Sequence, residues 1–184
     1  MPKPQSGSLE EQAQRLLDDV GITTIPVPVE KIARHLGAQV RYSPLDDELS
    51  GMAFVKDGVP IIGVNALHHS NRQRFTVAHE IAHLLLHREH ITTTVHVDKG
   101  FSVSVLKRDA TSAAGTERLE IEANQFAAAL LMPRAILDEI LASTQIDIDD
   151  EAALEAFARK FKVSKATLEF RIRNLSTEQP SRKR

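Results

Sequence analysis

Three residues in one short apolar stretch could together bind a metal ion and activate a water molecule. His79, Glu80 and His83 stand in the order H-E-x-x-H. Residues four apart lie on the same side of a helix, so the imidazoles of His79 and His83 can converge on one ion. Glu80 lies about 100° around the helix from His79, where its carboxylate can reach a water on that ion. The pattern is typical of zinc hydrolases, in which zinc lowers the pKa of a bound water to about 7.

The residues around this motif indicate that its helix is buried. The apolar neighbours are Val77, Ala78, Ile81, Ala82, Leu84, Leu85 and Leu86. Because buried ionisable groups need a partner, one metal ion would satisfy the motif, whereas a structural role would require separate hydrogen-bond partners. His87 continues the four-residue row, but a rise of about 1.5 Å per residue places it about 12 Å from His79, too far to share the ion. We therefore expect His87 to be a cleft or surface histidine.

A second helix, predicted from about Thr116 to Met132, could supply the third metal ligand. Its small residues would let a neighbouring helix approach closely. They include Ala123, Ala127 and Ala128. Glu120 and Asn124 share one face of this helix, so Glu120 could bind the metal while the Asn124 amide steadies another ligand from behind. Glu122 is the alternative ligand, and both carboxylates could instead be ordinary surface charges.

Composition indicates a globular protein with one core. The chain has 184 residues, of which 42% are hydrophobic and 26% are charged. The net charge of -2 argues against a nucleic-acid surface that covers the whole protein. Because there is no cysteine, any metal must rest on histidines and carboxylates. Neither a signal-peptide core nor an apolar run of about 18 residues is found, so we expect a soluble, cytoplasmic protein.

The other elements are predicted to hold the two ligand helices in an α+β fold. A Ser8/Glu11 capping box opens a first helix that ends at Gly21. Further segments with regular apolar patterns are a helix at 29–36, strands at 38–42, 51–55 and 59–64, and an additional strand at 101–105. We expect the three consecutive strands to form a small antiparallel sheet that packs on the metal helix. That helix would begin after Asn71 as its N-cap and run to about His87.

The C-terminal part is predicted to be helical. Ser164 caps a last helix that carries Arg171 and Arg173, and the preceding helix and turn give the pair the outline of a helix-turn-helix. Residues 171–184 contain five Lys or Arg and one Glu, a local charge of +4. Most such helix pairs simply pack, so DNA binding is the minority interpretation.

These patterns predict three parts along the chain. Residues 8–133 would form the core that carries the metal motif, 134–175 a helical C-terminal subdomain, and 176–184 a flexible basic tail.

Two motifs of the chain resemble those of the ImmA/IrrE family of metallopeptidases. The first is Phe75-Thr-x-Ala-His-Glu-x-Ala-His-Leu-Leu-Leu-His87, and the second is Glu120-Ile-Glu-Ala-Asn-x-Phe-Ala-Ala-Ala-Leu-Leu-Met-Pro133. The second motif makes the resemblance specific, and the resemblance extends from about Ile25 to about Leu175.

This resemblance implies a compact gluzincin-like α+β protease. It implies that His79, His83 and Glu120 are the zinc ligands and that Glu80 is the general base. Members of the family typically cleave a helix-turn-helix repressor, which is often encoded next door, and so switch its genes on.

We therefore expect a zinc endopeptidase that hydrolyses one peptide bond in a protein regulator, with Glu80 carrying the proton to the leaving amine. The alternative is a toxin-like or regulatory partner of a helix-turn-helix protein, which keeps the metal site but acts by association. A third and weaker hypothesis places the C-terminal helices on DNA, and a steep loss of affinity with added salt would reveal it.

Overall fold

The computed structural model describes residues 7–88, 96–98, 110–143 and 151–178. In this part of the chain there are seven helices and one four-stranded sheet, which confirms the α+β class. The helices are α1 (Leu9–Val20), α2 (Val29–His35), α3 (Ser70–Leu86), α5 (Ala110–Leu131), α6 (Arg134–Ser143), α7 (Glu151–Phe161) and α8 (Lys165–Glu178). The strands are β1 (Gln39–Ser43), β2 (Gly51–Lys56), β3 (Val59–Asn65) and β4 (His96–Asp98).

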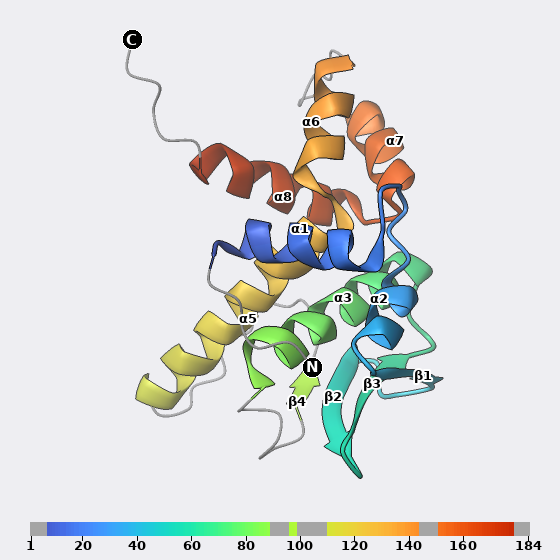
Figure 1. The fold of residues 1–184 in the computed structure, drawn as a ribbon, viewed down its shortest axis with the longest axis vertical. Coiled ribbons are helices and arrows are strands. Elements are labelled where there is room, and N and C mark those ends of the chain that lie inside the picture. The colour runs from blue at the N-terminus through green and yellow to red at the C-terminus, as the bar shows by residue number, and fades with distance from the viewer. Residues whose placement is uncertain (1–6, 89–95, 99–109, 144–150, 179–184) are drawn as a thin grey trace.

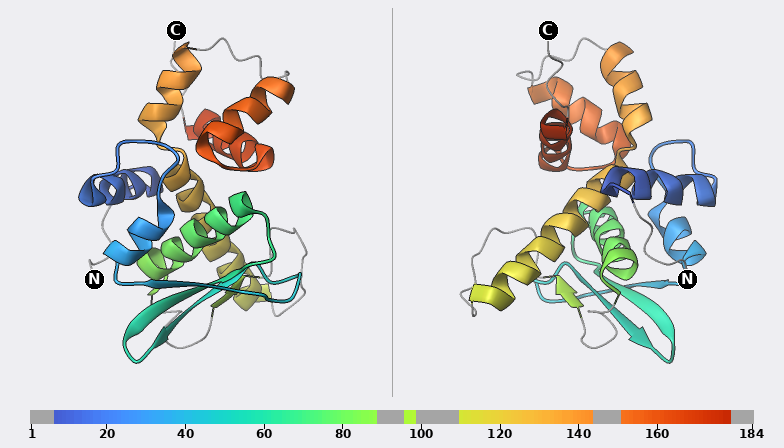
Figure 2. Two further views of the ribbon diagram at one scale, coloured as in Figure 1. Left: turned by 90° about the vertical axis from the view of Figure 1, so that its right-hand side faces the viewer. Right: turned by 60° about the vertical axis from the view of Figure 1, so that its left-hand side comes forward.

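The elements are arranged in layers. Figure 1 shows the sheet at one end of the molecule, α6, α7 and α8 at the other, and α3 and α5 between them. The two views of Figure 2 show the same order from other sides. None of the described helices combines the length and the apolar character needed to cross a membrane.

The first helix is fixed at both ends as its sequence predicts. The Ser8 hydroxyl accepts a hydrogen bond from the Glu11 amide at 3.2 Å, and the Ser8 amide donates to the Glu11 carboxylate at 3.3 Å. Gly21 ends the helix in the left-handed region, with φ of 68°. The capping box and the glycine stop are therefore confirmed.

The sheet is mixed, so the expectation of a wholly antiparallel sheet is wrong. The strand order is β1-β3-β2-β4, in which β2 pairs antiparallel with both β3 and β4, whereas β1 pairs parallel with β3. The loop after β1 carries the chain past the position of β3 and into β2, so that β3 later lies between β1 and β2. The buried Asn65 amide holds that loop by donating to the carbonyl oxygens of Leu45, Asp46 and Leu49 at 3.3, 3.1 and 2.9 Å.

Strand β4 lies in a segment for which the sequence predicted no strand. His96 lies in this strand, which pairs with β2 through Gly51, Met52 and Ala53. The strand expected at 101–105 lies outside the described residues.

Helix α3, the predicted metal helix, begins two residues earlier than its cap prediction. His69 is the N-cap, and its Nδ1 accepts from the Asn71 amide at 3.2 Å. The Asn71 side chain instead donates to the Val163 carbonyl at 3.0 Å. Asn71 therefore links α3 to the turn before α8 through a hydrogen bond, and its assignment as the N-cap was wrong.

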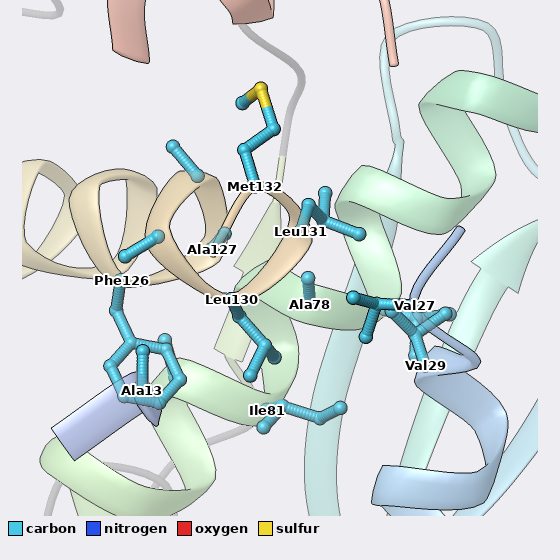
Figure 3. Close-up of a cluster of buried hydrophobic side chains, with 14 of the residues drawn as sticks. Ala13, Val27, Val29, Ala78, Ile81, Phe126, Ala127, Leu130, Leu131 and Met132 are labelled. Atoms are coloured by element: carbon cyan, nitrogen blue, oxygen red, sulfur yellow. The ribbon is translucent and has the colours of Figure 1, made fainter. Parts of the chain in front are cut away.

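The core lies where α5 crosses α3, and it continues from α1 to α8. Figure 3 shows Leu130 and Leu131 of α5 close to Ile81 and Ala78 of α3, and Phe126 beside Ala13 of α1. The alanines predicted to allow close approach are fully buried; they are Ala123, Ala127 and Ala128. Because burial of one large apolar side chain contributes about 1.5–3 kcal/mol, this crossing holds the two ligand helices firmly together.

The C-terminal helices pack on the core through Arg171, which the sequence placed in a basic surface cluster. Its side chain is 3% exposed and lies against Glu10 of α1. Ser164 caps α8 as predicted, because its hydroxyl accepts from the Thr167 amide at 3.1 Å. Helix α8 continues to Glu178, into the segment predicted as a tail, and residues 179–184 lie outside the described part.

Candidate metal centre

Two helices bring His79, His83 and Glu120 to one point. His79 and His83 lie on successive turns of α3 and are buried, while Glu120 projects from α5 with 33% of its side chain exposed. The two Nε2 atoms are 2.9 Å apart. The Glu120 oxygens lie 3.2 Å from His79 Nε2 and 3.4 Å from His83 Nε2. In the described part of the chain, this is the one group of three such side chains that could hold a metal ion.

These separations fit a zinc ion. Zinc binds imidazole nitrogen and carboxylate oxygen at about 2.0–2.2 Å, so at tetrahedral angles two such donors lie about 3.3–3.6 Å apart. The three observed separations, 2.9, 3.2 and 3.4 Å, come within a few tenths of an ångström of that range. A possible metal-binding triad is therefore present, and it contains Glu120 rather than Glu122.

The Asn124 amide sets the direction of the His79 lone pair. Asn124 Oδ1 lies 2.9 Å from His79 Nδ1. An amide oxygen only accepts, so Nδ1 carries the hydrogen and Nε2 presents a lone pair to His83 and Glu120. Electron pairs that face one another across about 3 Å repel, and a cation between them removes the repulsion. Asn124 thus lies where its predicted supporting role requires.

A glycine that sequence reasoning missed lies close to Glu80. The Glu80 side chain is 0% exposed. A Cβ added at Gly51 of β2 would lie 3.6 Å from Glu80 Oε1 and 2.8 Å from the Gly63 carbonyl oxygen, and would collide with the Thr76 methyl group. Strand β2 can therefore pass this close to Thr76, one turn before Glu80 on α3, only because residue 51 has no side chain. The isolated glycine at the start of a predicted strand was the available signal.

Glu122 and His87 form a second cluster behind the triad. His87 is 5% exposed, so the expectation of a cleft or surface residue was wrong, although His87 is not part of the triad. Its Nδ1 lies 3.0 Å from His83 Nδ1, and its Nε2 lies 3.2 Å from Glu122 Oε2. Arg118 donates to the other Glu122 oxygen at 2.8 Å. These hydrogen bonds, that from Arg118 foremost, hold the pKa of Glu122 below its usual value.

The four-residue spacing could have revealed the His87 contact. The spacing that brings His79 and His83 together also brings His83 and His87 together, one turn further along α3. The separation of His79 and His87, on which the expectation from sequence rests, excludes a shared ion. That separation says nothing about the contact between His83 and His87.

Comparison with known proteins finds a family model and solved structures that match the chain. Residues 33–173 match the family model described as Peptidase_M78: IrrE N-terminal-like domain. Eleven chains of solved structures match the fold. One is described as a Mycobacterium tuberculosis transcriptional regulator and shares 22% sequence identity with this chain, with a TM-score of 0.63. The match covers 95% of this chain and 48% of that one, so this chain spans about half the length of its structural match. No curated protein matches the sequence.

Proposed function

Because this chain belongs to the Peptidase_M78 family of IrrE N-terminal-like domains, we propose that it is a zinc-dependent endopeptidase that cleaves a protein regulator. The observation that carries the proposal is the convergence of His79, His83 and Glu120 beside Glu80, on two helices that the core holds together.

The ligand set that we propose for zinc is His79, His83 and Glu120. The donor separations support it, and Asn124 supports the correct tautomer of His79 from behind. A catalytic zinc site with three protein ligands leaves a position for water or substrate. When bound, zinc would lower the pKa of that water and polarise the scissile carbonyl group.

We assign the general base to Glu80. Its carboxylate would accept the proton of the attacking water and give it to the leaving amine nitrogen. Glu80 directly follows His79 on α3, so the proton acceptor and a ligand are fixed by the same helical turn.

We propose a helix-turn-helix transcriptional repressor as the substrate, which would place the reaction in the cytoplasm. The match to a protein described as a transcriptional regulator supports a regulatory setting. The burial of Arg171 speaks against the competing DNA-binding role for the last helices, since a side chain paired with Glu10 is withheld from phosphate groups.

The test is to express the protein with a helix-turn-helix protein encoded beside it and to follow the mass of that partner. Wild type should cut it, whereas a chelator and Glu80→Gln should each abolish cleavage. Glutamine keeps the shape of the buried side chain but cannot take the proton, and loss of a general base costs about 10²–10⁴ in rate. Glu117→Gln is the matched control, because Glu117 is exposed on α5 and is not part of the triad.

Two results would overturn the proposal. If Glu80→Gln cuts the partner as fast as wild type does, the assignment of the base is wrong. If wild type binds the partner tightly and never cuts it, the protein acts by association.

A further inference from the structure

His87 occupies a buried position at the end of α3, in contact with a proposed zinc ligand but outside the ligand set. We propose that His87 is a positioning residue that fixes the tautomer of His83, and that Glu122 fixes His87 in turn. The inference rests on the proposed metal site and assigns a role to two residues behind it.

The assignment follows from where the ring N–H hydrogens of His87 and His83 must lie, given the contacts from Glu122 to His87 and from His87 to His83. The Glu122 carboxylate only accepts, so the 3.2 Å contact requires the hydrogen of His87 to be on Nε2. A neutral imidazole has one N–H, which leaves His87 Nδ1 as an acceptor. The 3.0 Å contact between the two Nδ1 atoms then requires His83 to donate. His83 Nε2 is therefore left with a lone pair, directed at His79 and Glu120.

Each proposed histidine ligand thus has its own acceptor behind it. For His79 the acceptor is the Asn124 amide oxygen of α5, and for His83 it is His87 of the same helix. The opposite tautomer of His83 would direct an N–H at the ion and could not bind it. Such supporting hydrogen bonds commonly change metal affinity by about 10–100-fold when they are removed.

Glu122 is suited to this role by its second oxygen. That oxygen accepts from Arg118, whose side chain is 81% exposed, so the Arg118 contact is screened by water and contributes little to stability. The contact with His87 lies deeper, since the His87 side chain is 4% exposed. We therefore expect Glu122 to influence zinc binding mainly through its contact with His87.

Two substitutions at His87 distinguish its proposed role as a hydrogen-bond acceptor from a role in packing alone. In His87→Asn the amide oxygen is bonded to Cγ, as Nδ1 is in histidine, so an acceptor for His83 is retained. His87→Leu fills similar space without any acceptor. The measurement is the zinc dissociation constant of the full chain, by competition with a chromophoric chelator, together with the visible absorption spectrum of the Co²⁺-loaded protein. Thermal unfolding of the metal-free variants checks that each one folds.

We expect His87→Leu to raise the zinc dissociation constant about 10–100-fold and to alter the Co²⁺ spectrum, while His87→Asn stays near wild type. Glu122→Ala should weaken zinc binding in the wild-type background but not in His87→Leu, because its effect passes through His87. Glu117→Ala on the same helix is the control and should change nothing.

The possible failures are distinguishable. If wild type binds no zinc, or His79→Ala binds it fully, the proposed metal site is wrong. If zinc binding depends on His79 but His87→Leu binds as tightly as wild type, only the role of His87 is wrong. Equal weakening by His87→Asn and His87→Leu would mean that packing matters and the acceptor does not. Should His87→Leu not fold, Glu122→Ala decides, and an unchanged dissociation constant there overturns the inference.

Discussion

Replacing Arg171 by alanine should destabilise the protein strongly, because this one side chain joins three segments that are far apart in sequence. Its guanidinium group pairs with both oxygens of Glu10 on α1, at 2.6 Å each. Its Nε donates at 3.2 Å to the carbonyl of Met132, just beyond the end of α5. The two-pronged geometry is the strongest form of an arginine–carboxylate pair.

The size of the expected loss of stability follows from the burial of the Arg171–Glu10 ion pair. Removing one partner of a buried ion pair costs about 3–5 kcal/mol. The Glu10 side chain keeps 19% of its exposure, so water can partly solvate the carboxylate that remains. We therefore expect a loss of about 2–4 kcal/mol in the free energy of unfolding. For a chain of this length, each kcal/mol lowers Tm by about 2–4 °C, which gives a fall of about 4–16 °C.

Thermal and urea unfolding of Arg171→Ala and Arg173→Ala provides the test. Arg173 is exposed on the same helix, so its removal should change stability by no more than about 0.5 kcal/mol. Glu10→Ala should also destabilise, and the double variant should be less unstable than the sum of the single variants. If Arg171→Ala and Arg173→Ala unfold at the same temperature, the buried pair does not hold the helices together, and the argument against a DNA-binding role for Arg171 is lost.

Two further predictions concern the site. Gly51→Ala should lower the free energy of unfolding by about 1–3 kcal/mol in urea unfolding, because the new methyl group meets Thr76 and the Gly63 carbonyl; wild-type stability would mean that β2 moves freely there. Glu120→Gln should strip bound zinc under dialysis, as measured by elemental analysis, whereas Glu122→Gln should keep about one zinc per chain, and the reverse order would make Glu122 the ligand.

Local sequence patterns predicted much of the helical structure and the part of the candidate site that lies on α3. The spacing of His79 and His83 is a property of a single helix, so it could be read before any packing was known. The choice between Glu120 and Glu122 needs the rotation of α5 against α3, which repeats of apolar residues define only loosely. The structure brings Glu120 to the histidines and turns Glu122 toward His87.

The features that could not be predicted depend on contacts between distant residues. The parallel pairing of β1 requires the loop held by Asn65, and nothing in the alternation of a strand specifies which neighbour it takes. Arg171 looked like a member of a basic surface because its partner, Glu10, lies 161 positions earlier in the chain. A charged residue in a helical pattern is normally exposed, and only the pairing across the fold reverses that expectation.

The division of the ligands between two helices has a consequence for how the site is held. The C-terminal half of α5 is fixed by buried side chains from Phe126 to Met132, and Arg171 binds the carbonyl at its end. The turn that carries Glu120 is less buried, since Ile121 is 48% exposed and the Glu120 side chain is 33% exposed. The core therefore fixes the C-terminal half of α5 against α3 more closely than it fixes the turn that carries Glu120. A metal ion bound by His79, His83 and Glu120 would join that turn to the buried helix, so its binding free energy would also stabilise the fold.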